Sequence, residues 1–553
     1  MSVSFAVALA VVAPFFYLGT ASGHDVAFHM ASWLDAVGQW KQGVIFPRWT
    51  EWANFGFGEP RFIFYPPLSW LFGALLGTFF PWQSVALVFN LCVQTLAGVS
   101  AYALLRRLVE FRFAALFGAA CFAANPYALL IVYMRSDFAE LLALAFFPLL
   151  LLAAFGLSGA ITSEPRPSQF TQIFLFAVFF AAIWLSNAPA AVIATYSMAL
   201  FFAFAALRRR SFGPLINGSA SMALGFFLAA FYLVPAIYEQ RWVNISGALA
   251  GGLRPSDNFL FARTGDAEHD AFNHIASKLA VLLILWLLLA VVAAVRTRIA
   301  QQKPAGEQPR DVRWSVITLA SASILLMLPV TGIFWNFLPE LRFVQFPWRW
   351  SSILALGAMT LTAASMRGKL RWIWPIAATI TLSACAMFLV KHGWWDTEDM
   401  PTLQAAVQSG AGFEGTDEYD PSGDDHSALV QQQPRAGMIP SSTDPEIHEE
   451  AKIAIEQWDG EHRRIHVSVR RPGRIALRLL DYPAWQATVN GKPVEVLHAK
   501  DVTQMIVPVP EGSSEVRLDF ARTSDRTLGG WISLATVFGS VAGLIVGRRR
   551  ASL

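Results

Sequence analysis

The chain has 553 residues, of which 55% are hydrophobic and only 15% are charged, and its mean hydropathy is +0.45. A soluble protein of this length needs more charge to cover its surface, so the composition indicates a polytopic membrane protein. The net charge of +3 is close to neutral, which argues against nucleic acid as a partner. The three cysteines, Cys92, Cys121 and Cys385, lie in apolar runs, so we expect neither a disulfide framework nor a cysteine-based zinc site.

Long apolar runs recur along the chain. A bilayer core of about 30 Å requires roughly 20 apolar residues per helix. The runs predict about twelve spans, near residues 3–20, 84–105, 113–133, 138–157, 170–186, 189–206, 213–236, 277–295, 314–335, 350–366, 372–390 and 530–546. The opening run lacks a basic flank and a clean small-residue cleavage site, so we expect a retained first span rather than a signal peptide.

A further apolar patch, "PPLSWLFGALLGTFF" at 66–80, decides the orientation. If this patch lies in the membrane interface, all the basic loops fall in the cytoplasm, as the positive-inside rule requires. These loops are 106–112, 208–210, 296–303, 367–371 and 548–550. We therefore predict twelve spans with both ends in the cytoplasm and the longest polar regions outside.

The polar regions divide the chain into four parts. We predict a transmembrane domain over 1–390 with its first outer loop at 21–83, an irregular outer segment at 391–450, a small β-sandwich at 451–528, and a final helix with a basic tail at 529–553. Segments such as "RRIHVSVRR" and "WQATVNGKPVEVL" alternate polar and apolar residues, which is typical of half-buried strands. Asn490-Gly491 between two such runs predicts a type I′ hairpin turn.

The first outer loop, "GHDVAFHMASWLDAVGQWKQGVIFPRW", begins with three polar residues at the water line: His24, Asp25 and His29. The spacing of the apolar residues over 26–42 predicts a helix in the interface with its indoles at headgroup depth. An aromatic belt that only anchors the loop would give a similar composition, and both interpretations stay open. Arg48, Arg61 and Tyr65 follow among Gly and Pro residues.

Two other short segments carry charge beside a span. In "YMRSDFAE", Arg135, Asp137 and Glu140 fall within six residues, and a carboxylate at the start of a span is costly unless it is paired or faces water. These residues could simply pair locally in a turn. Alternatively, they meet Asp25, and two carboxylates then hold a divalent cation or share general-base and orienting roles.

The third segment is "LRFVQFPWRW", with Arg342, Gln345 and Arg349. Guanidinium groups at headgroup level match phosphate oxygens bidentately. Lipid headgroups would satisfy these arginines, and so would a substrate that carries a phosphate.

The motifs "GHDVAFH…FGFGEPRFIFYPPLSWL", "NPYALLIVYMRSDFAELL", "VQFPWRW" and "YPAWQATVNGKPVEV" together resemble the bacterial multispanning family of 6-pyruvoyl-tetrahydropterin-synthase-related membrane proteins. The architecture is similar to the GT-C class of glycosyltransferases, which use polyprenyl-phosphate-linked sugars on the outer face of the membrane. The resemblance implies an acidic residue just after span 1, which matches Asp25. Members of that class commonly carry paired acids in this loop, whereas here it supplies one carboxylate.

The resemblance implies a GT-C-like enzyme of the bacterial inner membrane that moves a sugar from a polyprenyl-phosphate donor to a glycan, lipid or protein acceptor of the cell envelope. The expected catalytic residues are Asp25, Glu140 and Asp137; the expected substrate-binding residues are His24, His29, Arg48, Arg61, Tyr65, Arg135, Arg342, Gln345 and Arg349. The sequence establishes no cofactor, and a divalent cation, Mg²⁺ or Mn²⁺, on Asp25 and Asp137 stays one open alternative. The alternative function is a scaffold, or a carrier of lipid or polysaccharide. The spans carry almost no ionisable residues, which favours chemistry at the surface over translocation.

Overall fold

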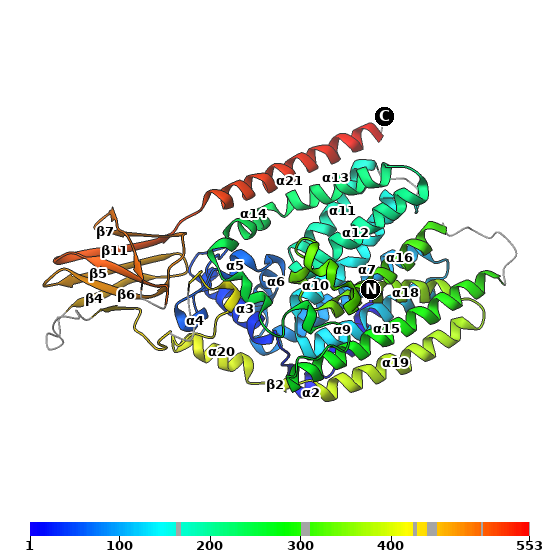
Figure 1. Ribbon diagram of the computed structural model, residues 1–553, viewed down its shortest axis with the longest axis horizontal. Helices are drawn as coiled ribbons and strands as arrows, with labels where there is room; N and C mark the ends of the chain where they lie inside the picture. Colours follow the sequence, from blue (N-terminus) through cyan, green and yellow to red (C-terminus); the bar gives the residue numbers. More distant parts are fainter. Residues whose placement is uncertain (162–167, 300–309, 424–428, 440–450, 499–501, 552–553) are drawn as a thin grey trace.

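The computed structural model describes residues 1–161, 168–299, 310–423, 429–439, 451–498 and 502–551. A body of packed helices lies at one end of the long axis and two β-sheets lie at the other (Figure 1). Within the described residues, seven helical segments are long and apolar enough to cross a membrane. They are α7 (Trp82–Leu108), the continuous run of α8 (Arg112–Ala123), α9 (Pro126–Leu130) and η1 (Ile131–Arg135), then α10 (Phe138–Leu157), α12 (Ala188–Arg209), α15 (Ala267–Ile299), α19 (Leu370–His392) and α21 (Ser524–Ala551).

Other predicted spans are bent or short. The pair α13 (Gly213–Leu228) and α14 (Ala230–Glu239) is bent by 77°, and the pair α16 (Arg310–Leu326) and α17 (Gly332–Phe337) by 91°. Three apolar segments are shorter: α1 (Ser2–Val12) with α2 (Phe15–Leu18), α6 (Pro67–Phe79) and α11 (Gln169–Trp184). The described chain thus offers up to nine spans, and the predicted count of about twelve is not confirmed.

Two short helices show how length separates a membrane span from a buried or an interfacial helix. Helix α18 (Ser351–Ser365) has 15 residues and is buried among α8, α15 and α16, so its apolar character reflects packing inside the body. Helix α6 has 13 residues and is about 20 Å long at 1.5 Å per residue. It is too short to cross a core of about 30 Å, as the interfacial prediction for 66–80 requires.

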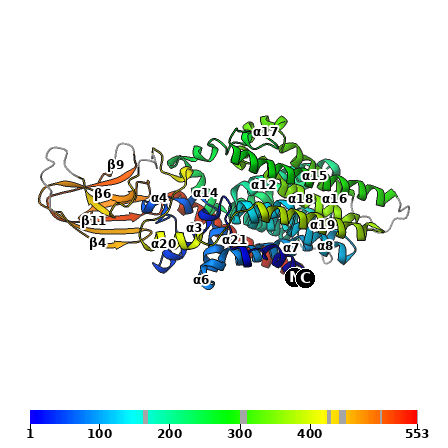
Figure 2. The same cartoon turned by 90° about the horizontal axis from the view of Figure 1, so that it is seen from below.

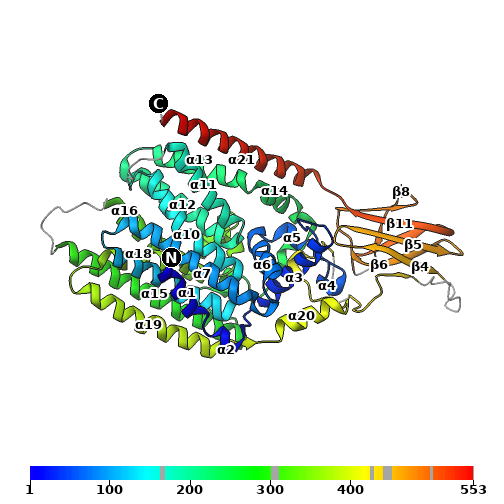
Figure 3. The same cartoon turned by 180° about the vertical axis from the view of Figure 1, so that it is seen from behind.

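The first outer loop folds between the helical body and the sheets (Figure 3). It forms α3 (Val26–Lys41) and the turns α4 (Ala53–Gly56) and α5 (Arg61–Phe64). Helix α3 exists as predicted, but its indoles do not all lie at headgroup depth. Trp33 is fully buried, stacks on Phe89 with ring centroids 5.5 Å apart, and lies so close to Gly73 that a Cβ there would overlap the indole. The reason is that α6 and α20 (Asp399–Gln408) cover α3.

The C-terminal region contains two antiparallel sheets that share one hydrophobic core, which confirms the predicted sandwich. One has the order β3-β6-β10-β9 and the other β4-β5-β11-β7-β8. The strands are β3 (Ala436–Met438), β4 (Lys452–Trp458), β5 (His462–Val469), β6 (Gly473–Leu480), β7 (Trp485–Val489), β8 (Lys492–Pro493), β9 (Leu497–His498), β10 (Gln504–Val509) and β11 (Gly512–Phe520). Asn490 and Gly491 join β7 to β8 with φ of 51° and 73°, as a type I′ turn requires.

The segment predicted to be irregular, 391–450, is partly regular. It contains α20, whose Met400 is buried, the strand β3, and β2 (Trp395–Asp396), which pairs with β1 (Thr20–Ala21). Composition missed these elements because contacts with distant parts of the chain stabilise them. Residues 424–428 and 440–450 of that segment lie outside the described residues.

The sheets are docked on the first outer loop as well as joined to the last helix (Figure 2). Trp49 lies in the sandwich core and meets Trp485 edge to face at 5.8 Å. Arg526 at the start of α21 makes two bonds of 2.7 Å to Glu239 at the end of α14, and the Tyr482 hydroxyl donates to the same carboxylate at 2.6 Å. This buried network fixes the sandwich against the helical body.

Candidate functional site

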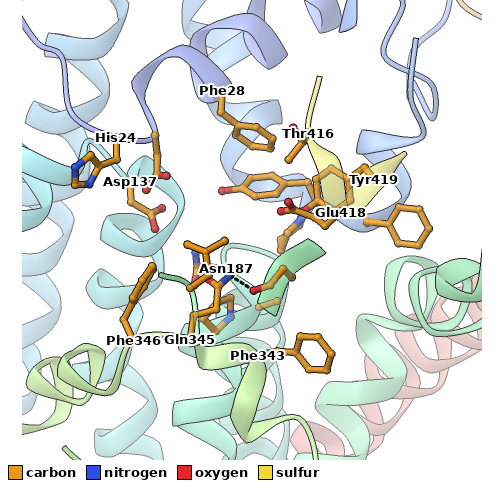
Figure 4. Close-up of a pocket in the computed structure, with 18 of the residues that line it drawn as sticks. His24, Phe28, Asp137, Asn187, Phe343, Gln345, Phe346, Thr416, Glu418 and Tyr419 are labelled. Carbon is orange, nitrogen blue, oxygen red and sulfur yellow. Dashed lines mark hydrogen bonds between the residues drawn. The ribbon is translucent and has the colours of Figure 1, made fainter. Parts of the chain in front are cut away.

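A cavity of about 1500 Å³ lies where the first outer loop meets the helical body (Figure 4). Its walls come from α3, the turn between η1 and α10, the start of α12, α14, the stretches 245–272 and 340–349, and residues 413–419. Among the residues predicted for the site, eight line this cavity: His24, Asp25, Arg61, Tyr65, Arg135, Asp137, Gln345 and Arg349. The structure therefore brings the three charged motifs of the sequence to one place.

A row of alternating charges forms one wall of the cavity. Asp25 Oδ2 lies 2.5 Å from Arg135 Nη2, which is 3.5 Å from Asp137 Oδ2. The same Asp137 oxygen is 3.4 Å from Arg349 Nη2, and Arg349 Nε is 3.0 Å from Glu140 Oε2. Except for Asp25 these side chains are almost completely buried, so each charge depends on its neighbours for compensation.

Backbone contacts hold Asp25 against Arg135. The π-turn η1 ends at Ser136, which has a φ of 51°, and its hydroxyl donates to the Ala21 carbonyl at 2.6 Å. The Asp25 amide donates to the Arg135 carbonyl at 2.9 Å. A Cβ on Gly23 would lie 2.5 Å from the Arg135 carbonyl carbon, so only glycine allows the two chains to approach this closely. Single π-turns of this kind are frequent at functional sites.

Asp137 is an ionised, structural carboxylate. Its Oδ1 caps α10 by accepting from the Glu140 amide at 2.9 Å, and His29 Nε2 is 3.6 Å away. Burial by itself would raise the pKa of Asp137, but His29, Arg135 and Arg349 outweigh burial and hold that pKa well below its ordinary value. Asp137 therefore stays charged at any physiological pH and anchors both arginines.

Of the two carboxylates in this row that line the cavity, Asp25 is the one that a substrate can reach. It precedes α3, and its side chain is 33% exposed, compared with 5% for Asp137. No described residue donates to its Oδ1. Beside it, His24 lines the cavity, and burial followed by the charge of Arg135 lowers the pKa of its imidazole, which favours the neutral form.

Two residues predicted for the site lie behind the cavity wall. Glu140 is one turn inside α10, where it pairs with Arg349 and accepts from the Tyr127 hydroxyl. His29 is buried against Asp137 and Phe138. Neither lines the cavity, so the predicted catalytic role of Glu140 and the predicted substrate contact of His29 are not supported by their positions.

Two predicted arginines lie elsewhere. The Arg48 guanidinium sits over the Phe46 ring at 4.5 Å, and burial together with nearby Arg526 lowers its pKa to about 10. Arg342 is exposed and lies over the ring of the adjacent Phe343 at 4.9 Å. Neither arginine lines the cavity: Arg342 is exposed at the surface, and Arg48 is half-buried near Arg526 and Glu239.

The loop that carries Arg349 is strained at the cavity. Gln345 has φ 63° and ψ −57°, a conformation that costs a non-glycine residue about 1–3 kcal/mol. Its amide is held on both sides: Nε2 donates to the Ala248 carbonyl at 2.7 Å, and Oε1 accepts from Arg349 Nη1 at 3.4 Å. Such strain is typical of sites where a side chain must be aimed at a ligand.

The residues proposed for a divalent cation do not fit one well. Arg135 Nη2 contacts both Asp25 and Asp137, so a guanidinium already occupies the position between the two carboxylates. In the part of the chain that the structure describes, no group of three or more His, Cys, Asp or Glu residues is arranged to hold a metal ion.

Some residues of the cavity wall were not predicted. Thr416, Glu418 and Tyr419 belong to the segment expected to be irregular. Tyr127, which lies behind the wall and donates to Glu140, is inside a predicted span. The only signal in the sequence for the first three is the alternation of acidic and aromatic residues in "GFEGTDEYD".

The geometry defines a polytopic membrane protein with a charged cavity beside an antiparallel sandwich. The model of the family described as "6-pyruvoyl-tetrahydropterin synthase related domain; membrane protein" matches residues 62–392, and the chain belongs to this family. No curated protein matches the sequence.

The chain is similar to two solved structures of membrane transferases. The mycobacterial arabinofuranosyltransferase AftD is 15% identical, with a TM-score of 0.43 over 71% of this chain and 27% of its own. The oligosaccharyltransferase of Archaeoglobus fulgidus is 13% identical, with a TM-score of 0.39 over 75% of this chain and 55% of its own. The chain thus spans about a quarter and about half of the length of these two proteins.

Proposed function

We propose that the protein is a GT-C-type glycosyltransferase that moves a sugar from a polyprenyl-phosphate donor to a glycan, lipid or protein acceptor of the cell envelope, on the outer face of the bacterial inner membrane. One observation carries this proposal. A partly exposed carboxylate, Asp25, is paired with the buried Arg135 on the wall of a cavity of about 1500 Å³ in a membrane protein.

Asp25 is the general base of this reaction. The acceptor hydroxyl attacks the anomeric carbon, the bond from that carbon to the phosphate oxygen breaks on the opposite face, and the hydroxyl proton passes to Asp25. The electron pair of the broken bond leaves with the polyprenyl phosphate. Arg135 orients Asp25, and the Oδ1 atom, which accepts from no described residue, takes the proton.

Arg135 also supplies the charge that stabilises the leaving phosphate. Its Nε is buried without a hydrogen-bond partner, which is costly for a cation. Arg135 lines the cavity, so its positive charge would stabilise a phosphate oxygen there as negative charge develops. Arg349 is already bonded to Asp137, Glu140 and the Val344 carbonyl, so its role is to hold the row of charges in place.

The apolar part of the cavity suits the lipid of such a donor. Aromatic and aliphatic side chains of the helices and of the 340–349 loop form this part: Trp184, Val192, Phe226, Leu233, Ile237 and Phe343. A polyprenyl chain buries apolar surface here while its phosphate reaches the charged wall.

The proposal is tested by turnover in proteoliposomes. Purified protein is given a panel of polyprenyl-phosphate sugars, and released polyprenyl phosphate is measured with and without an envelope extract as acceptor. Release by wild type from at least one donor supports the transferase. The scaffold alternative predicts no release from any donor in the presence of the extract, and that result would contradict the proposal.

A further inference from the structure

A second part of the cavity wall is built by residues 412–422, which we call the strap. On one side the strap bonds to the first outer loop: the Phe413 amide donates to the Trp52 carbonyl at 2.9 Å, and the Thr416 amide donates to Glu59 at 2.8 Å. On the other side the Asn244 amide donates to the Asp420 carbonyl at 2.9 Å. The strap thus crosses between two segments that are distant in sequence.

Two glycines allow this close approach. Gly412 has a φ of 76°, and a Cβ there would lie 2.5 Å from the Gly56 amide nitrogen. A Cβ on Gly415 would overlap the Asn54 side chain, which is fully buried and bonded to Asp420 at 2.9 Å. The strap is therefore packed closely against the first loop, and these contacts fix the path of its backbone along the cavity wall.

The strap presents Thr416, Glu418 and Tyr419 to the cavity, on the side opposite His24 and Asp137 (Figure 4). The Glu418 carboxylate accepts no hydrogen bond from the side chain or backbone of any other described residue. Burial, followed by the charge of Glu59, raises its pKa to about 7. Because no other described residue donates to it, this half-buried acid can accept hydrogen bonds from a ligand in the cavity.

The neighbours of Glu418 determine which ligand fits. The Tyr65 and Tyr419 hydroxyls bond to no described residue, and Phe28 adds a ring to the same region. Aromatic faces and a carboxylate could bind either a sugar or an amine. However, the Arg61 guanidinium already lies over the Phe28 ring at 4.3 Å and donates to Thr416 at 3.2 Å. The Phe28 face is thus already occupied by a cation, whose charge Glu59 offsets at 2.6 Å, and the hydroxyls of Thr416 and the two tyrosines offer hydrogen bonds to a neutral polyol.

We infer that the strap and the facing aromatic residues bind a neutral sugar ring of the acceptor, with the Glu418 carboxylate accepting from two ring hydroxyls. This inference rests on the proposed glycosyl transfer for its role, since it places the acceptor across the cavity from the leaving phosphate at Arg135. It names the acceptor as a glycan or glycolipid rather than a protein side chain.

The test measures binding by the full-length protein in nanodiscs, without a donor. The probes are methyl glycosides of hexoses and pentoses, with methylammonium as the cationic comparison, followed by saturation-transfer NMR. We expect at least one glycoside to bind saturably and Glu418→Gln to weaken it at least tenfold. The control is Asp417→Asn, which makes the same charge change on the strap at an exposed residue that does not line the cavity; it should stay within twofold of wild type. Tyr419→Phe, which removes only a hydroxyl, should weaken the same glycoside severalfold.

Three results would overturn the inference: no glycoside binds, methylammonium binds more tightly than every glycoside, or Glu418→Gln and Tyr419→Phe both bind as wild type does. Unchanged thermal unfolding of the variants separates lost binding from lost folding. Failure of the proposed function is distinguishable from these results. Glycoside binding through Glu418 without any donor turnover would contradict the transferase and support the sugar site. Donor turnover without glycoside binding would support the transferase and contradict the sugar site.

Discussion

Replacing Arg349 with methionine tests whether the buried row of charges is organised as described. The change removes the guanidinium and keeps a side chain of similar length. Glu140 then retains only the Tyr127 hydroxyl, and Asp137 retains Arg135 at 3.5 Å together with His29. The variant thus leaves a buried carboxylate without its cation.

The expected cost follows from burial. Arg349, Asp137 and Glu140 are all at most 5% exposed, so solvent does not screen their interactions. Removing one partner of a buried ion pair costs about 3–5 kcal/mol, because the other charge is left uncompensated. Adding Glu140→Gln removes that uncompensated charge, so the double variant should be less destabilised than the sum of the two single variants by about 1–3 kcal/mol.

The free energy of unfolding of the four proteins is measured by pulse proteolysis in mixed micelles over a range of denaturing detergent. Arg349→Lys is the matched control, since a lysine keeps the charge but cannot reach both carboxylates as the guanidinium does. Its free energy of unfolding should lie between those of wild type and Arg349→Met. A loss below about 1 kcal/mol for Arg349→Met, or strictly additive effects in the cycle, would refute the organisation of this network.

Two further predictions concern stability and positioning. Burial, and then the charge of Glu51, raises the pKa of Asp35 from 3.8 to about 7, so the folded protein holds a proton there that the unfolded chain releases between about pH 4 and pH 7. Stability should therefore fall as the pH rises through that window, by up to roughly 4 kcal/mol, and Asp35→Asn should flatten the dependence of Tm on pH; equal slopes for both proteins would contradict this. Gly23→Ala should reduce donor turnover at least tenfold without removing any ionisable group, because the added Cβ pushes Asp25 away from Arg135; full activity in this variant would show that the close approach is not required.

The sequence indicates which segments carry charge but not how they pair. "YMRSDFAE" and "VQFPWRW" are recognisable as polar motifs at span ends, yet Arg349 and Glu140 are 209 residues apart, and only the packing of the helices brings them to 3.0 Å. A local Arg135 pair was an equally good expectation. The structure contains this local pair with Asp137 as well as the distant pair with Asp25.

How deeply a helix is buried is harder to predict from the sequence than the helix itself. The spacing of apolar residues identifies α3, but a buried helix and an interfacial helix have the same hydrophobic period. Residues 26–42 alone do not indicate that α6 and α20 cover this helix. The strap is a similar case. Its Gly, Asp and Glu residues are typical of irregular chain, and its fixed path depends on Gly412 and Gly415 packing against a loop more than 350 residues earlier.

The most direct test of the central claim compares wild type with Asp25→Asn in proteoliposomes that contain a donor turned over by wild type. Donor binding is measured separately on the same samples. Asparagine keeps the shape of the side chain and can still accept from Arg135, but it cannot take a proton at neutral pH. We predict that polyprenyl-phosphate release falls by about 10²–10⁴-fold while donor binding stays within a few fold of wild type. Equal release by the two folded proteins would contradict the assignment of Asp25 as the general base.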